Sequence, residues 1–272
     1  MSQSIAVLHP GEMGVSVARA LADAGQEPCW LPAGRSPATL ARAAAFTAYE
    51  NLPELLSRVS GVFSVCPPHA ALAQAEQVAA AGFSGTYVDA NAVAPSTAVR
   101  IADIVGAGYV DGGIIGPPAL SPDTTRLYVS GPGAEDVVAW FSGSKLQAIA
   151  VSTETTAASS LKMAYAAFTK GSSALLLAVN ALAEHAGVRD ALVAEWMISQ
   201  PGLVKRSANT ALGTSRKAWR FAGEMEEISR TFAEAGLPGE IHAGAADVFQ
   251  RMAGLKDLPP SDLEKVLQAL LD

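Results

Sequence analysis

A glycine-containing turn, LHPGEMG at residues 8–14, follows the apolar run 4–8 and precedes an alanine-rich helical segment. Many proteins bind the pyrophosphate of a dinucleotide at such a turn, because free N–H groups at a helix start attract anions. Two glycines fit the motif G-x-G-x-x-G, whose first glycine is replaced by His9. The spacing predicts a cofactor-binding turn made of His9, Gly11, Glu12, Met13 and Gly14. The alternative is an ordinary turn whose glycines serve packing alone.

The segment after the second apolar run, CWLPAGRSPATL at 29–40, contains no acidic residue. NAD enzymes usually carry an acid there, which accepts hydrogen bonds from the adenosine ribose. Arg35 and Ser36 lie at this place instead, and a guanidinium with a hydroxyl suits the extra phosphate of NADP. We therefore predict NADP as the cofactor. Ser36 followed by Pro37 is equally an ordinary helix N-cap, and Arg35 alone could be a solvated loop residue.

The composition bounds the classes of protein that the chain can be. Its 272 residues are 50% hydrophobic with a mean hydropathy of +0.24, which is enough for one large or two medium domains with substantial cores. No uninterrupted apolar stretch approaches the roughly 20 residues of a spanning helix. With a net charge of −7 and no long basic cluster, nucleic acid is not an expected partner.

The N-terminus and the cysteines point to the cytoplasm. The chain enters its first strand-like run within a few residues, and no basic segment followed by an apolar one predicts a secretory signal. Cys29 and Cys66 both lie in apolar, strand-like surroundings and fit no metal-ligand spacing. We expect two reduced core thiols and no structural metal.

The elements that must position the turn alternate up to about residue 150. Short β-rich runs are expected at 4–8, 29–31, 45–47, 62–66, 86–89, 109–111, 127–130 and 147–151, with helices at 13–24, 72–81 and 97–105 between them. Such alternation is typical of parallel βαβ units. After about residue 155 only helical patterns follow, at 156–186, 189–200, 203–212, 215–235, 239–253 and 261–271. The predicted fold is a Rossmann-like, doubly wound parallel sheet over residues 1–154, followed by an all-α domain over 155–272.

Four stretches of this chain, together, resemble the β-hydroxyacid dehydrogenase superfamily, which includes 6-phosphogluconate and 3-hydroxyisobutyrate dehydrogenases and imine reductases. They are PGEMG at 10–14, DANAVAP at 89–95, YVDGGIIGPPA at 109–119 and TAASSLKMAYAAFTKG at 156–171. The resemblance covers essentially the whole chain. It is closest to a less characterised branch with a distinctive C-terminal helical domain, to which residues 219–238 look similar.

The resemblance implies roles for particular residues. Lys162 stands where the family has its catalytic lysine, and Tyr165 stands close to the place of the asparagines that usually follow it. Asp111 and Gly116 match the substrate-binding loop, in which Pro117 replaces the last glycine, and Gly112 and Gly113 are assigned to the same loop. The predicted cofactor site also extends to Cys66, Pro67 and Asn91. The family further implies a homodimer, which the alanine-rich, weakly charged helices of 156–253 also favour.

The residue types at the lysine suit proton transfer. When a hydride leaves an alcohol carbon, another group must take the hydroxyl proton, and a lysine can do so if burial or a neighbouring cation lowers its pKa. On a helix, Lys162, Tyr165, Thr169 and Ser173 share one face. A snorkelling surface lysine and a packing tyrosine are the alternatives.

These features predict an NADP-dependent oxidoreductase acting on a small hydroxy acid or related carbonyl compound, with Lys162 as general acid and base. Ile115 replaces the loop serine that usually helps to bind a carboxylate, so the substrate stays open. An imine reductase is the second possibility, and a catalytically silent NADPH-binding scaffold is the third. The sequence does not identify the substrate, the direction of the reaction or whether decarboxylation follows.

Overall fold

The computed structural model describes residues 2–272 and forms two compact units. The first unit ends at Met163, and the second extends from Ala164 to Asp272. The division falls inside one long helix, α7 (Ala157–His185), whose first turns belong to the sheet-containing unit. The sheet-containing unit therefore includes Lys162.

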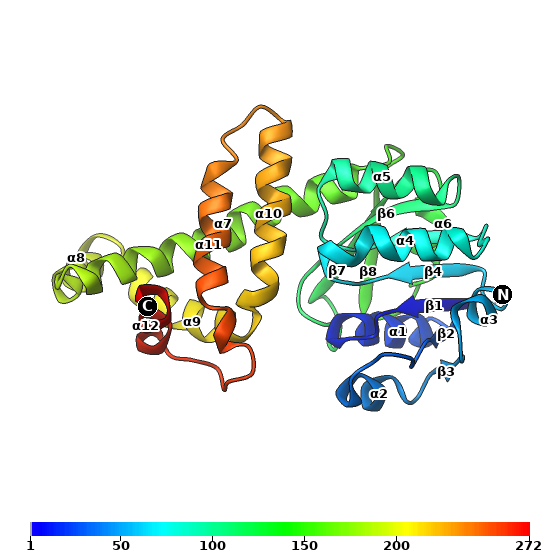
Figure 1. Ribbon diagram of the computed structural model, residues 1–272, viewed down its shortest axis with the longest axis horizontal. Coiled ribbons are helices and arrows are strands. Elements are labelled where there is room, and N and C mark those ends of the chain that lie inside the picture. The colour runs from blue at the N-terminus through cyan, green and yellow to red at the C-terminus, as the bar shows by residue number, and fades with distance from the viewer. Residues whose placement is uncertain (1) are drawn as a thin grey trace. The chain divides into compact units, whose positions relative to one another are not determined.

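The first unit contains an eight-stranded sheet with the order β3-β2-β1-β4-β5-β6-β7-β8 (Figure 1). Its strands are β1 (Ser4–Leu8), β2 (Glu27–Trp30), β3 (Thr47–Ala48), β4 (Gly61–Ser64), β5 (Thr86–Asp89), β6 (Tyr109–Ile115), β7 (Thr125–Ser130) and β8 (Leu146–Ser152). The order reverses between β1 and β4, which is the switch point where doubly wound sheets bind ligands. The predicted Rossmann-like, doubly wound fold is confirmed.

One strand pair departs from the predicted parallel sheet, because β7 runs antiparallel to β6. The connection 116–124 between these strands holds no helix, and a connection without a crossover element returns a strand antiparallel. The other pairs are parallel, including β7 with β8, which α6 (Ala134–Ala139) connects. The sheet is therefore mostly parallel.

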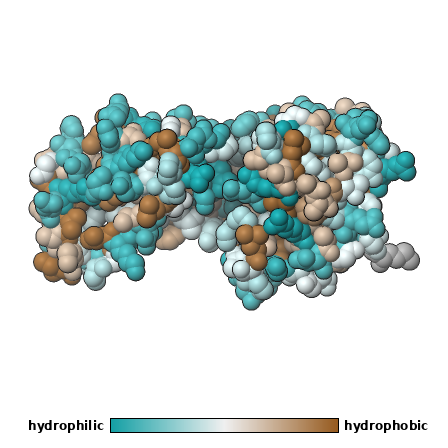
Figure 2. Space-filling model, turned by 90° about the horizontal axis from the view of Figure 1, so that it is seen from below, coloured by the Kyte–Doolittle hydropathy of each residue, from teal (hydrophilic) through white to brown (hydrophobic). Residues whose placement is uncertain are grey.

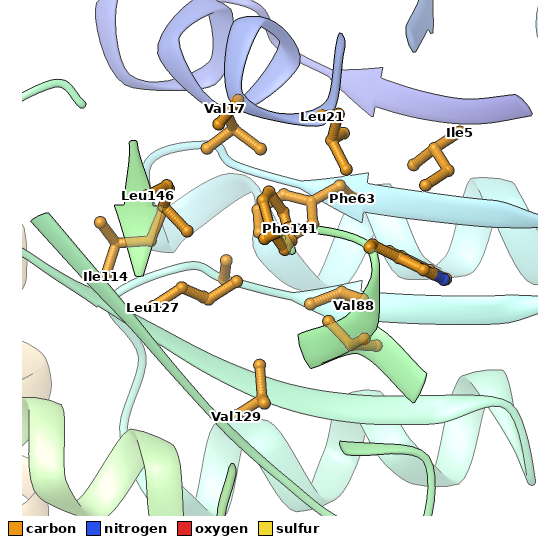
Figure 3. Close-up of a cluster of buried hydrophobic side chains, with 14 of the residues drawn as sticks. Ile5, Val17, Leu21, Phe63, Val88, Ile114, Leu127, Val129, Phe141 and Leu146 are labelled. Carbon is orange, nitrogen blue, oxygen red and sulfur yellow. The ribbon is translucent and has the colours of Figure 1, made fainter. Parts of the chain in front are cut away.

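Both faces of the sheet are buried, as the alternation of side chains along β1 shows. Ile5 and Val7 join a core that contains Val17 and Leu21 of α1 (Glu12–Asp23) and Phe63 of β4 (Figure 3). Ala6 and Leu8 join the core on the opposite face, beneath α4 (Ala71–Ala80) and α5 (Pro95–Val105). Burial on both faces explains why the central strands β1 and β4 are mostly apolar. The remaining helices of this unit are α2 (Pro37–Ala43), α3 (Leu52–Leu56) and the short 3-10 turn η1 (Pro68–Ala70).

The second unit is helical in all its described elements, as the sequence predicts. After α7 it contains α8 (Arg189–Ser199), α9 (Leu203–Thr214), η2 (Ser215–Lys217), α10 (Ala218–Glu234), α11 (Glu240–Arg251), η3 (Ala253–Leu255) and α12 (Leu263–Leu271). Helices α10 and α11 form a hairpin, in which Phe221 and Phe249 pack edge to face with ring centroids 5.4 Å apart. Lys170 of α7 forms an ion pair with Glu224 of α10 and lies 5.0 Å from the Phe221 ring centre. These contacts join α7 to the hairpin.

By length and composition, α7 alone among the described helices is long and apolar enough to cross a membrane. The core helix of a soluble protein passes the same test. Both lysines of α7 have partners inside the protein, Ile114 for Lys162 and Glu224 for Lys170. Partnered, partly buried lysines at two levels are typical of a core helix rather than one facing lipid.

Candidate active site

The glycine turn connects β1 directly to α1 at the switch point of the sheet. Gly11 is the N-cap residue of α1, and no side chain caps this helix in the described chain. A Cβ atom on Gly14 would lie 2.5 Å from the carbonyl oxygen of His9, so only glycine permits this close approach. A Cβ on Gly11 would meet nothing within 4 Å. The turn therefore presents open space in front of an uncapped helix N-terminus.

His9 holds the backbone in the left-handed region, with φ of 63°, where the motif usually has glycine. Its carbonyl accepts a 2.7 Å hydrogen bond from Gly11 N–H. Burial and, to a smaller extent, the positive charge of Arg35 together lower the pKa of His9 to about 4. The imidazole is therefore neutral near pH 7.

Ser36 and Arg35 have different surroundings. Ser36 is the N-cap of α2, and its Oγ accepts a 3.3 Å hydrogen bond from Thr39 N–H. Its alternative interpretation as a helix cap is thus observed, and a role with a ligand stays a prediction. Arg35 is half-buried and its Nε is shielded from solvent without a hydrogen-bond partner. Burial lowers the pKa of Arg35. The charge of its guanidinium acts on His9, so the two side chains are neighbours.

Asn91 is buried and bonds the ends of two strands together. Its Oδ1 accepts a 2.5 Å hydrogen bond from Cys66 N–H, and its Nδ2 donates to Ser64 Oγ at 3.1 Å and to Asp89 Oδ1. Asp89 Oδ1 also accepts from Asn91 N–H at 3.1 Å. Asn91 therefore holds the backbone of the Cys66–Pro67 segment in place. Its predicted contact with the cofactor is untested.

Burial governs the titration of this cluster. Burial, with a smaller contribution from the nearby Asp111, raises the pKa of the Asp89 carboxyl to about 7 against the opposing effect of the hydrogen bonds from Asn91. It also raises the pKa of the Cys66 thiol to about 12, with Asp89 contributing. The pKa of Cys29 is likewise raised by burial. Both thiols are free and remain protonated near neutral pH, as expected of reduced core cysteines.

Asp111 lies at the centre of the other predicted group and is fully buried. Its carboxylate accepts hydrogen bonds from Ser159 N–H at 2.7 Å, from Ser159 Oγ at 2.5 Å and from Ser130 Oγ at 3.3 Å. Ser130 Oγ in turn accepts a 3.0 Å hydrogen bond from Ala158 N–H. These side chains of β6 and β7 satisfy the first turn of α7, so Asp111 positions the helix that carries Lys162.

Lys162 lies against the end of β6. Its Nζ donates a 2.6 Å hydrogen bond to the carbonyl oxygen of Ile114. A Cβ on Gly113 would lie 3.0 Å from Lys162 Cβ and 2.9 Å from the Ala158 carbonyl oxygen, so Gly113 lets α7 approach the strand. Gly112 similarly lies close to Asp89 of β5, and Gly116 has φ of 126° in the following turn. The predicted substrate-loop glycines thus have packing roles, and their contact with substrate is untested.

Tyr165 follows Lys162 by three residues on α7 and is 47% exposed. The other two members of the predicted polar stripe bond within the helix, because Thr169 Oγ1 donates to Tyr165 O at 3.1 Å and Ser173 Oγ donates to Thr169 O at 2.8 Å. The phenol is therefore the member of the stripe, besides Lys162, whose polar end is available for chemistry. Its catalytic role remains a prediction.

The structure also adds four hydrogen-bonding residues to the predicted site. Asp89, Ser64, Ser130 and Ser159 form the hydrogen bonds that hold Asn91 and Asp111. The position of Asp89 and Asp111 at two strand ends was visible, but the serines gave no signal because their partners are 19 to 48 residues away. Among the described residues, no group of three histidine, cysteine or acidic side chains can hold a metal.

The residues at the turn fit a phosphorylated nucleotide. The N-terminus of α1 is uncapped, the space above Gly11 is open, and a cationic side chain with an unpartnered Nε lies beside His9. Free helix N–H groups and a guanidinium are the donors that phosphate oxygens take. Glu12 is exposed and its side chain adds no positive charge, so only its backbone suits this role.

One family covers part of the helical unit. Residues 183–252 match the family described as a domain of unknown function, DUF1932. The match runs from the end of α7 to α11 and agrees with the distinctive C-terminal domain noted in the sequence. No curated protein matches the chain.

Solved structures resemble the chain over nearly its whole length. A 3-hydroxyisobutyrate dehydrogenase from Mycobacterium tuberculosis, solved with L-serine, has a TM-score of 0.68 at 16% identity and covers 100% of both chains. A reductive aminase from Aspergillus terreus, solved with NADPH and ethyl levulinate, has a TM-score of 0.57 at 18% identity, covering 98% of this chain and 99% of that one. An imine reductase from Pseudomonas sp. has a TM-score of 0.54 at 20% identity, covering 99% and 100%. The resemblance found in the sequence is confirmed at the level of the fold: the chain has the fold of the 3-hydroxyacid dehydrogenases and imine reductases.

Proposed function

We propose that the protein is an NADP-dependent oxidoreductase that transfers a hydride between nicotinamide and a small hydroxy acid or related carbonyl compound. The observation that carries this proposal is the position of Lys162, whose Nζ is fixed at 2.6 Å from Ile114 O beside the substrate-loop segment. The fold shared with 3-hydroxyisobutyrate dehydrogenase supports the reaction class. The NADPH bound to the reductive aminase supports a nicotinamide cofactor.

The turn and the following loops would hold the cofactor. A bound nicotinamide nucleotide would supply the hydride acceptor or donor. Gly11, Met13 and the α1 N-terminus would hold its pyrophosphate, and Arg35 with Ser36 would hold the adenosine 2′-phosphate. The segment of Cys66 and Pro67, fixed by Asn91, would line the same site.

Lys162 would move the proton. When an alcohol is oxidised, its carbon loses a hydride and its hydroxyl loses a proton, and the neutral amine of Lys162 takes that proton. When a carbonyl is reduced, the ammonium returns it to the oxygen. The ammonium has three N–H donors, so one can stay on Ile114 O while another reaches the substrate oxygen. Tyr165 would assist at the same oxygen.

Imine reduction is the second candidate. Ile115 is 4% exposed and stands in place of the loop serine, so this position offers no hydroxyl to a substrate carboxylate. The shared fold with the reductive aminase and the imine reductase is consistent with a substrate that lacks that carboxylate. A cyclic imine is therefore the substrate class to compare directly with hydroxy acids.

The proposed assembly is a cytoplasmic homodimer, with residues 1–154 binding the cofactor and 155–272 serving substrate binding and dimerisation. Tyr165, Phe168, Leu175 and Leu182 follow one another along α7 at spacings of a single helix stripe and are between 47% and 73% exposed. Other hydrophobic residues, drawn brown, reach the surface of the helical unit on the left of Figure 2. Light scattering should give a dimer of the 27.9 kDa chain, and a monomer at micromolar concentration would contradict this assembly.

The reaction is tested by following NADPH absorbance with a panel of hydroxy acids, keto acids, aldehydes and cyclic imines. Turnover with a hydroxy or keto acid supports the first candidate, and turnover with cyclic imines alone supports the second. NADPH binding without turnover of any member would favour a silent scaffold. Calorimetry with NADPH and NADH on the same preparation measures the cofactor preference.

A further inference from the structure

His9 is the most unusual residue of the predicted cofactor turn. It keeps φ at 63°, a backbone conformation that a side chain strains and that glycine adopts freely. Strained residues of this kind persist where the surrounding structure holds them, and they cluster at ligand sites. The strained backbone of His9 therefore points to a role for its imidazole at this turn.

The side chains of His9 and Arg35 both carry unsatisfied nitrogens. His9 Nδ1 and Arg35 Nε are shielded from solvent and have no hydrogen-bond partner in the described chain. Buried polar atoms are nearly always hydrogen-bonded, so each unpartnered nitrogen calls for an explanation. Two of them at neighbouring strand ends, after β1 and after β2, indicate one ligand that both could serve.

The two side chains lie close enough to interact. The positive charge of Arg35 disfavours protonation of His9 and adds to the effect of burial, so the imidazole stays neutral near pH 7. A neutral imidazole beside a guanidinium offers an N–H donor without a second charge. The pair thus matches an oxygen-rich anion that takes one ionic and one neutral hydrogen bond.

We propose that His9 is a specificity residue that joins Arg35 in holding the adenosine 2′-phosphate of NADP. The inference rests on the proposed function, because it assigns a further donor to the same cofactor. Arg35 supplies the charge and His9 supplies a directed hydrogen bond to the phosphate or the adjoining ribose oxygen. A glycine at this position would leave the phosphate to the guanidinium alone.

The experiment uses fragments that separate the phosphate from the rest of the cofactor. Calorimetry measures the affinity of the full chain and its variants for adenosine 2′,5′-bisphosphate and for adenosine 5′-monophosphate, which differ only in the 2′-phosphate. His9→Gly should weaken binding of the bisphosphate about threefold to tenfold, the range of one neutral hydrogen bond, and leave the monophosphate unchanged. His9→Asn, which keeps an N–H donor and tolerates positive φ, should retain most of the bisphosphate affinity.

Several outcomes would overturn the inference. Unchanged affinities for both nucleotides in His9→Gly, or an equal loss of both, would show that the imidazole does not contact the 2′-phosphate. Inorganic phosphate binding as tightly as the bisphosphate, and losing affinity in His9→Gly, would indicate a free-anion site instead. If Arg35→Ala removes the preference for NADP while His9→Gly does not, the proposed cofactor stands and only the role of His9 fails. If the unmodified chain binds neither nucleotide, both are wrong.

Discussion

The two helices that begin at the candidate site, α1 and α7, differ in whether side chains accept hydrogen bonds from the N–H groups of their first turns. Helix α1 begins at Gly11 with no side-chain cap and open space in front of it. Helix α7 begins with the N–H groups of Ala158 and Ser159 bonded to Ser130 and Asp111. One N-terminus is left for an external anion, and the other is closed by the protein itself.

One edge of the sheet thus has two helix N-termini with different roles. An open helix N-terminus attracts phosphate, but its partner must arrive from solution. A closed N-terminus fixes the direction of its helix, and Lys162 lies only one turn further along α7. Under the proposed function, the unsatisfied end would bind the cofactor phosphate, and the satisfied end would place the proton-transfer group Lys162.

The largest effect is expected at Lys162. Lys162→Ala should lower turnover about a hundredfold or more, the usual contribution of a positioned acid or base, with NADPH affinity nearly unchanged. Lys162→Arg should not restore turnover, because a guanidinium keeps its proton near neutral pH. Steady-state kinetics on the substrate found by the panel would measure both, with the exposed Lys205→Ala as the matched control. More than about a tenth of the activity in Lys162→Ala would direct attention to Tyr165 as the proton route.

Removing the Asp111 carboxylate, which accepts hydrogen bonds from the start of α7, should lower the free energy of unfolding. Asp111→Ala removes the acceptor of Ser159 N–H and of three buried hydroxyls, those of Ser159, Ser130 and Tyr109, at about 1 to 3 kcal/mol for each group left unsatisfied. Part of this loss is offset, because burial raises the pKa of Asp111 and so makes its charge costly. We expect a net loss of about 2 to 3 kcal/mol in the free energy of unfolding.

Urea unfolding would measure the loss in Asp111→Ala, with two companion variants. Asp111→Asn keeps one acceptor oxygen and should lose less than Asp111→Ala. Asp103→Ala changes the same charge on the exposed surface of α5 and should be nearly neutral. Equal stability of Asp111→Ala and Asp103→Ala would mean that the start of α7 does not depend on this carboxylate.

The sequence predicted the open end better than the closed one. The strand at 4–8, the turn and the helix after it follow from local patterns, and β1 and α1 lie where they were expected. The closed end depends on contacts between residues far apart in the chain, such as Asp111 with Ser159. The family motif brought Asp111 to notice as a substrate residue, but nothing local could show its bonds to α7.

The same reasoning explains the other departures from the sequence analysis. The antiparallel β6–β7 pair follows from the lack of a helix in 116–124, which the short apolar runs did not reveal. Asn91 was predicted from a motif at the end of β5, whereas its bond to Cys66 N–H joins two strand ends and is visible only in three dimensions. Helix α7, expected at 156–186 and found at Ala157–His185, shows that a long apolar periodicity is reliable on its own.

At the open end, Arg35→Ala should reduce the preference for NADP over NAD by about tenfold to a hundredfold. One charge-assisted hydrogen bond to a phosphate contributes about 1.5 to 3 kcal/mol, which corresponds to that range. Calorimetric titration with both cofactors measures the ratio, and the exposed Arg19→Ala on α1 removes the same charge nearby as a control. Equal affinity of the unmodified protein for the two cofactors would refute the NADP assignment.

The smallest effect is expected in His9→Gly, and it concerns the free energy of unfolding that is lost to the strained backbone before α1. Glycine adopts the left-handed backbone without strain, so the free energy of unfolding of the variant should be about 1 kcal/mol higher at pH 7. The folded pKa of His9, about 4, lies below its unfolded value of 6.5. The free energy of unfolding of the unmodified protein is therefore unaffected by this group above pH 6.5 and decreases as the pH falls toward 4. In this pH range the His9 imidazole binds a proton in the unfolded chain but not in the folded chain.

The difference between His9→Gly and the unmodified protein should therefore widen, by on the order of 1 kcal/mol, between pH 7 and pH 5. Urea unfolding at both pH values measures it. Asp123→Gly is the matched control, since Asp123 has φ of 61° on an exposed turn and carries no imidazole. It should gain similar stability at pH 7 with little widening at pH 5 and no change in cofactor preference. If His9→Gly were less stable than the unmodified protein at both pH values, the imidazole would be a packing residue, and the turn would be closed rather than open.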